Sequence, residues 1–175
     1  ARLHAALELI AEVEASGQPA DAVISAGFRS RRDLRDEDRA RLSDLVYAVL
    51  RTWARIGWRL AHLETPATPR TRLLAWLALG EGVPRERTEA QFSGGRDAPE
   101  RLSPAERTLL GRLAGGTLDH PDMPDAVRAE CPDWALEPLR ARFGDGFAAE
   151  MAAMLSPPPL DLRVNPLKST REAVL

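Results

Sequence analysis

The stretch LSDLVYAVLRTWARIGWRLAHL, residues 42–63, decides the fold class, because its apolar residues recur at the spacing of one helix face. Intervals of three and four residues, kept for about six turns, give a helix an apolar stripe that must face a core. Gly57 lies inside this pattern and marks either a kink or a close contact with another helix. The sequence therefore predicts a long helix packed against others. The stripe consists of Leu42, Leu45, Val46, Val49, Trp53, Ile56, Leu60 and Leu63.

Helix signals continue on both sides of this stretch. Residues 3–13 carry apolar side chains at helical spacing, and a short helix is expected after Pro19. Thr68 before Pro69 is typical of a helix N-cap followed by proline at the first helical position. Ser103 followed by Glu106 has the spacing of a capping box. We therefore predict a mainly α fold for the first two-thirds of the chain.

The last third has a different character. Helices are predicted over residues 134–143 and 147–155, and three consecutive prolines at 157–159 stop the second one. Residues 160–165 then alternate apolar and polar, the one clear strand signal, and a new helix begins at Ser169 or Thr170. Because a lone strand leaves its backbone groups unpaired, we expect the chain to continue into a sheet beyond Leu175.

Composition limits the class of protein. The chain has 175 residues, 44% of them hydrophobic and 29% charged, which supports a buried core and argues against a membrane protein. We expect no secretion leader. Cys131 is the single cysteine, so no internal disulfide is expected, and this agrees with a reducing cytoplasm. We interpret Cys131 as a structural residue.

Signals for catalysis and for metal binding are weak. The sequence has no phosphate-binding glycine loop and no recognisable Ser-His-Asp set. His4, His62 and His120 are scattered without ligand spacing, so no metal site is expected, and His62 is interpreted as structural. We therefore predict no catalytic residue and no cofactor site in these residues.

The basic residues give the candidate RNA contacts. Of 24 basic residues only Lys168 is a lysine, and arginine suits bidentate binding of phosphate, although codon bias of a GC-rich genome is an alternative cause. Three groups of basic residues are candidates. The alternatives to RNA contact are a salt-bridged surface for the first group, a solvated helix face for the second and an interdomain polar network for the third. Trp58 falls off the apolar stripe and could stack on a base. The predicted RNA-binding residues are Arg29, Arg31, Arg32 and Arg35; Arg51, Arg55 and Arg59, expected as a ridge on one helix; and Arg163, Asn165 and Lys168, with Arg163 and Asn165 expected on one face of the strand.

Two segments resemble a known family. Residues 158–168, PPLDLRVNPLK, followed by Thr170-Arg171-Glu172, resemble the segment preceding the catalytic domain in the RsmB/Sun family of RNA cytosine-C5 methyltransferases. Residues 38–51 resemble the NusB-like helical domain that many of these enzymes carry. The resemblance implies a NusB-like helical RNA-binding domain over 1–120. It also implies that 121–175 form the start of a small α+β subdomain, truncated here, before a methyltransferase domain outside this chain.

The resemblance also implies a function. The chain would be the RNA-binding accessory region of an S-adenosylmethionine-dependent ribosomal RNA cytosine-C5 methyltransferase of the cytoplasm. Neither the family's cysteine pair nor its cofactor loop matches residues here, and Cys131 lies outside that region, so the chain alone is expected to be inactive. Ribosomal RNA is the expected partner, with no membrane or metal and with the oligomeric state open. The alternatives are a stand-alone NusB-like antitermination factor and a helical protein–protein module.

Overall fold

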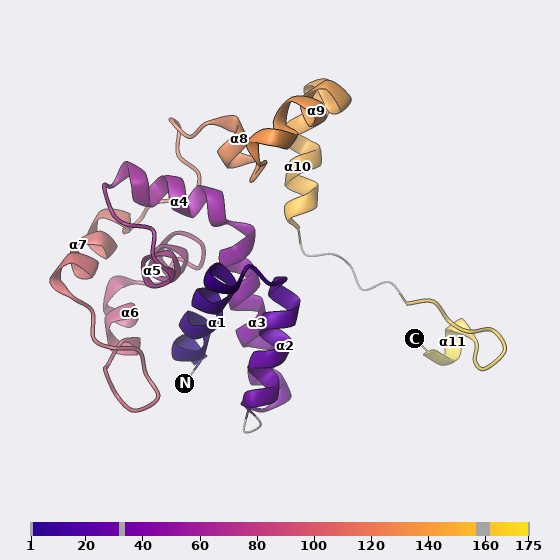
Figure 1. The fold of residues 1–175 in the computed structure, drawn as a ribbon, viewed down its shortest axis with the longest axis horizontal. Helices are drawn as coiled ribbons and strands as arrows, with labels where there is room; N and C mark the ends of the chain where they lie inside the picture. Colours follow the sequence, from indigo (N-terminus) through magenta and orange to yellow (C-terminus); the bar gives the residue numbers. More distant parts are fainter. Residues whose placement is uncertain (1, 32–33, 157–161, 175) are drawn as a thin grey trace.

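The computed structural model describes residues 2–31, 34–156 and 162–174 and confirms the mainly α fold class (Figure 1). A short 3-10 turn, Gly144–Gly146, separates α9 from α10. The helices are α1 (Arg2–Ser16), α2 (Ala20–Ser30), α3 (Asp36–Arg51), α4 (Trp53–His62), α5 (Pro69–Leu79), α6 (Arg85–Gln91), α7 (Pro104–Leu113), α8 (Asp125–Arg128), α9 (Asp133–Phe143), α10 (Phe147–Leu155) and α11 (Arg171–Val174).

Helices α1 to α7 enclose the main hydrophobic core. Helix α1 packs against α2, α3 and α5, while α5 packs in addition against α4, α6 and α7. Six of the eleven residues of α5 are buried, as expected for a helix surrounded by others. The fully buried side chains of the core come from separate helices and include Ile10, Val46, Ile56, Leu74 and Leu113.

The prediction of a single long helix over residues 42–63 is wrong, because Thr52 interrupts the helix and separates α3 from α4. Thr52 has φ −119°, and its hydroxyl donates to the carbonyl of Ala48 at 2.8 Å, a bond by which threonine competes with regular helix. The apolar stripe survives the break, since Val49, Ile56 and Leu60 are all fully buried. The sequence thus identified the buried face but not the bend.

Gly57 marks a close contact and no break in the helix. A Cβ at this position would lie 3.3 Å from Nη1 of Arg72, so the glycine leaves room for a guanidinium from α5. Arg72 is 8% exposed, stacks on the ring of Trp53 at 3.7 Å and donates from Nη1 to the carbonyl of Trp53 at 2.8 Å. Burial lowers the pKa of Arg72. This arginine therefore holds α5 against the start of α4.

A second, smaller core lies in helices α8 to α10. Ala129, Cys131, Ala135, Phe147 and Met151 form it, and Figure 1 places α8 beside α4. The burial of Cys131 agrees with the structural role predicted for it. Two separate cores support a division of the chain, while the boundary near residue 120 stays a prediction.

The strand expected over residues 160–165 is not formed in its described part. Residues 162–165 have no regular structure, and Leu160 and Asp161 lie outside the described residues. No described segment pairs with this backbone, which is the physical requirement for a strand. Residues 162–174, with α11, lie apart from the helical body in Figure 1, and none belongs to either core.

None of the described helices combines the length and the apolar character needed to cross a membrane.

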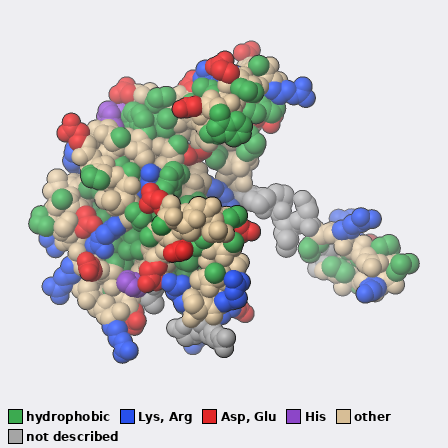
Figure 2. Space-filling view, in the orientation of Figure 1, with side chains coloured by type: hydrophobic (Ala, Val, Ile, Leu, Met, Phe, Trp, Pro, Cys, Tyr) green, Lys and Arg blue, Asp and Glu red, His purple; other side chains and the backbone are tan. Residues whose placement is uncertain are grey.

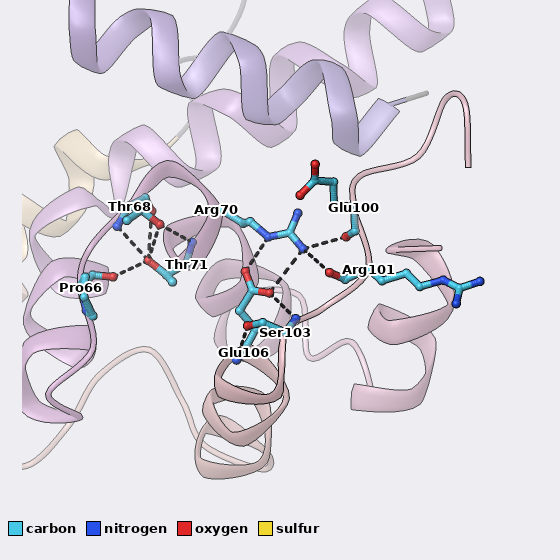
Figure 3. Close-up of polar contacts among 8 residues, drawn as sticks. All are labelled: Pro66, Thr68, Arg70, Thr71, Glu100, Arg101, Ser103 and Glu106. Carbon is cyan, nitrogen blue, oxygen red and sulfur yellow. Dashed lines mark hydrogen bonds and ion pairs between the residues drawn. The ribbon is translucent and has the colours of Figure 1, made fainter. Parts of the chain in front are cut away.

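Polar contacts at the start of α5 and α7 join these helices to the loop between α6 and α7 (Figure 3). Both predicted N-caps are confirmed: Thr68 with Thr71, and Ser103 with Glu106, form capping boxes. Arg70 of α5 donates to the carboxylate of Glu106 and, at 2.7 Å, to the carbonyl of Glu100. Glu106 also accepts the N–H of Ser103 at 2.7 Å. The N-termini of two helices are thus fixed by one carboxylate and one guanidinium.

We predict that Glu106→Gln removes part of the stability at neutral pH. Partial burial acts to raise the pKa of Glu106, but hydrogen bonds from Arg70 and Ser103 outweigh it and hold the pKa below its ordinary value. A depressed folded-state pKa stabilises the fold above the unfolded value of about 4.3 and stops doing so as the pH falls through the folded value. Urea unfolding at pH 7, 5, 4 and 3 should show a loss on the order of 1 kcal/mol at pH 7 that shrinks toward pH 3.

The matched control is Glu137→Gln, an exposed position beyond the first turn of α9, which should follow the unmodified chain at every pH. A difference between Glu106→Gln and the unmodified chain that stays constant from pH 7 to pH 3 would contradict this role for Glu106.

Candidate functional site

The break at Thr52 exposes the N-terminus of α4, and Glu130 covers it. The first amides of a helix have no partner within the helix, so they need an outside acceptor. Glu130, in the turn after α8, accepts the N–H of Ala54 at 2.7 Å and the N–H of Arg55 at 3.0 Å. A carboxylate at this end of a helix also interacts favourably with the helix dipole. The two cores are therefore joined by a cap that comes from about 75 residues further along the chain.

Arg55 completes this junction with two ion pairs. Its Nε donates to Glu130 Oε1 at 3.1 Å, and its Nη1 donates to Asp119 Oδ1 at 3.2 Å. The side chains of Arg55 and Glu130 are 16% and 9% exposed, so solvent screens the pair weakly. Glu130 has φ +49°, a left-handed conformation that costs about 1 kcal/mol in a non-glycine residue. The contacts to α4 offset that strain.

A cavity of about 470 Å³ opens beside the junction, between α4, α8 and α10. Arg55 and Arg128 line it together with Asp119 and Asp125, while α10 contributes apolar side chains such as Phe147. The volume of the cavity and its lining of charged and apolar side chains suit one small ligand with both polar and apolar parts.

The first predicted group of cations is only partly available for a ligand. Arg31 pairs with Glu8 and donates to the carbonyl of Gly27 at 3.0 Å. Arg32 lies outside the described residues. Arg29 and Arg35 are exposed, and no described residue pairs with either side chain. They lie at opposite ends of the connection between α2 and α3, where RNA contact stays a prediction.

The second predicted group does not form the expected ridge. Arg51 ends α3, whereas Arg55 and Arg59 belong to α4, because the helix breaks between them. Arg51 lies over the ring of Tyr47 at 5.4 Å, and Arg55 is held in the junction. Arg59 Nε is buried without a described partner, and burial lowers the pKa of this guanidinium. The prediction of a solvated ridge is therefore wrong. Contact of these arginines with RNA stays a prediction.

The third predicted group lies in the segment apart from the helical body. Arg163 and Asn165 do not share a strand face, because residues 162–165 form no strand. Asn165 instead forms a turn, its Oδ1 accepting the N–H of Leu167 at 3.0 Å and its carbonyl accepting that of Lys168 at 3.0 Å. Arg163 and Lys168 are exposed and have no described partner. Figure 2 shows basic side chains projecting from this segment, so its cations are open to solvent.

Several residues that shape the structure escaped the sequence analysis. Glu130 acts across too great a sequence distance for any local pattern to indicate it. Arg72 had an indirect signal, because Gly57 leaves space within the apolar stripe of residues 42–63. The expectation that the histidines are scattered is wrong for two of them, since His62 and His120 lie with ring centroids 4.9 Å apart. Trp58, predicted to stand off the core, stacks on His62 at 4.8 Å.

Comparison with known proteins agrees with the resemblance seen in the sequence. Residues 131–175 match the family model of the ferredoxin-like domain of RsmF/B-like methyltransferases. The chain is 26% identical over 182 residues to Ribosomal RNA small subunit methyltransferase B of Pectobacterium atrosepticum, a match that covers 97% of this chain and 42% of that protein. The chain therefore spans less than half the length of this relative. No solved structure matches the chain significantly. The two matches support the resemblance of the chain to the RsmB/Sun family.

We predict that Glu130→Ala lowers the free energy of unfolding by about 1–3 kcal/mol, because the amides of Ala54 and Arg55 and the Arg55 guanidinium lose their acceptor in a half-buried site. Urea unfolding measures the change. Glu137→Ala, at an exposed position of α9, is the matched control and should stay within about 0.5 kcal/mol of the unmodified chain. Equal stability of the two variants would show that the cap does not hold the cores together.

Proposed function

We propose that this chain is the RNA-engaging accessory region of an S-adenosylmethionine-dependent ribosomal RNA cytosine-C5 methyltransferase, as in the RsmB/Sun family that the comparisons support. The observation that carries the proposal is the alignment of 97% of the chain with a small-subunit ribosomal RNA methyltransferase. The match of residues 131–175 to the ferredoxin-like domain of RsmF/B-like methyltransferases also supports it. Such a substrate places the reaction in the cytoplasm.

In this proposal the chain holds RNA and does no chemistry itself. We assign neither S-adenosylmethionine nor a catalytic nucleophile to any described residue. The cations that suit the role best are Arg163 and Lys168, because they lie in the segment matched to the family domain and are exposed. Exposed arginine and lysine bind phosphates by displacing condensed counterions. Arg29 and Arg35 would extend the contact along the helical body.

The junction at Glu130 gives the helical body a defined place beside the matched domain. Because Glu130 caps α4 while Cys131 begins the matched range, the two parts meet within one residue of each other. The cap fixes the helical body relative to α8–α10, whereas residues 162–174, which carry Arg163 and Lys168, lie apart from that body, so an RNA bound by both would span the two parts. The helical body would thus orient the RNA for a catalytic domain that follows.

The activity is tested on the complete protein. Incubated with S-adenosylmethionine that carries a labelled methyl group and with small-subunit ribosomal RNA, it should place the label on C5 of cytosine. Label on another base, or none in RNA, would contradict the proposed reaction.

We predict that Arg163→Ala weakens RNA binding of the complete protein without changing its melting temperature. Loss of one phosphate contact should reduce the slope of log affinity against log salt by about 0.7–0.9, measured by fluorescence anisotropy at several salt concentrations. Arg87→Ala, an exposed arginine of α6, is the control and should leave the slope unchanged. A lowered melting temperature with unchanged affinity would show that Arg163 has a structural role. If the unmodified protein bound RNA independently of salt, or did not bind it, the result would favour a protein–protein module.

A further inference from the structure

His62, His120 and Asp122 come together at the surface although the two histidines are 58 positions apart in the sequence. Each offers one ligand atom, and these atoms all lie within 4.8 Å of one another. His62 and Asp122 are exposed, and His120 is partly buried. Neither the fold nor the proposed function uses this cluster.

The cluster is held from two sides. His62 is the last residue of α4, so a regular helix sets the position of its backbone. His120 and Asp122 lie in the loop before α8, where Arg128 Nη2 donates to the carbonyls of His120 at 3.2 Å and Met123 at 3.1 Å. Met123 is buried and anchors the same loop. The backbones that carry the three side chains are therefore fixed before any ligand binds.

The ring of Trp58 orients the imidazoles. His62 stacks on Trp58 with 4.8 Å between ring centroids and 14° between ring planes. His120 lies 5.3 Å from the same indole and 4.9 Å from His62, tilted against both. Packing of the three rings restricts the rotamers of the histidines, which lowers the entropy lost when they bind an ion.

We propose that His62, His120 and Asp122 bind a divalent transition-metal ion of the Zn²⁺ type. Two imidazole nitrogens and one carboxylate oxygen form a ligand set that suits Zn²⁺ and leaves a fourth, water-filled position. Mg²⁺ and Ca²⁺ prefer oxygen ligands, so the two imidazoles select against them. The ion would tie the end of α4 to the loop before α8, a second link beside the Glu130 cap.

Binding requires a small local rearrangement. Zn²⁺ bonds of about 2.0–2.1 Å place tetrahedral ligand atoms about 3.3 Å apart, so the ligand atoms must approach one another by at most about 1.5 Å. His62 and Asp122 are exposed and can move by rotation about their side-chain bonds. His120 Nδ1 now accepts the N–H of Asp122 at 3.2 Å. That long hydrogen bond is lost whichever nitrogen binds the ion, because binding through Nε2 places the proton on Nδ1.

Zinc titration of the metal-stripped chain tests the site directly. Isothermal titration calorimetry at pH 7.5 should show one ion per chain, with lower affinity in acid because protons compete with the ion for the imidazole nitrogens. His62→Ala, His120→Ala and the milder Asp122→Asn should each lose at least tenfold in affinity. His4→Ala is the matched control, because His4 lies on α1 and pairs only with Glu8 in the described structure; it should bind as the unmodified chain does.

A second readout uses Trp58 as a local reporter. Co²⁺ or Cu²⁺ bound beside the indole should quench tryptophan fluorescence, and Trp58→Phe should remove that quenching while zinc still binds. Circular dichroism of each metal-free variant checks that it folds. Absence of zinc binding, affinity in His62→Ala or Asp122→Asn equal to that of the unmodified chain, or quenching that persists in Trp58→Phe would each overturn the proposal.

Discussion

The amides at the start of α4 must find acceptors, and this requirement determines how the two cores of the chain meet. Thr52 ends α3 and begins a new helix whose first N–H groups face α8. Glu130 accepts two of them and pairs with Arg55 in a site that water reaches poorly. A buried carboxylate without these partners would be costly, and so would the unpaired amides. Each side of the junction therefore needs the other.

Several arginines of this chain stabilise the fold. Arg72 is buried against Trp53, Arg70 bridges α5 and α7, and Arg55 closes the junction. Their planar guanidinium groups satisfy several acceptors at once while their stems add apolar contact. An arginine-rich composition alone is thus no measure of an RNA-binding surface. The proposed contact with RNA rests on the cations left without a described partner, Arg163 and Lys168 among them.

Local patterns predicted much of the fold, and long-range contacts explain what they missed. The apolar stripe identified the buried faces of α3 and α4, and Thr68 and Ser103 marked two helix starts, because those signals depend on neighbours within a few residues. The bend at Thr52, the cap from Glu130 and the meeting of His62 with His120 depend on residues far apart in sequence. A strand over residues 160–165 needs a partner strand, and the described residues offer none.

Amide hydrogen exchange at Ala54 and Arg55, followed by NMR, tests the central claim most directly. These amides have no acceptor within α4, so only the Glu130 carboxylate can protect them. The account predicts exchange about as slow as that of amides in the interior of α4. Exchange at the rate of an unprotected loop, while the rest of α4 stays protected, would show that the two cores are not joined by this cap.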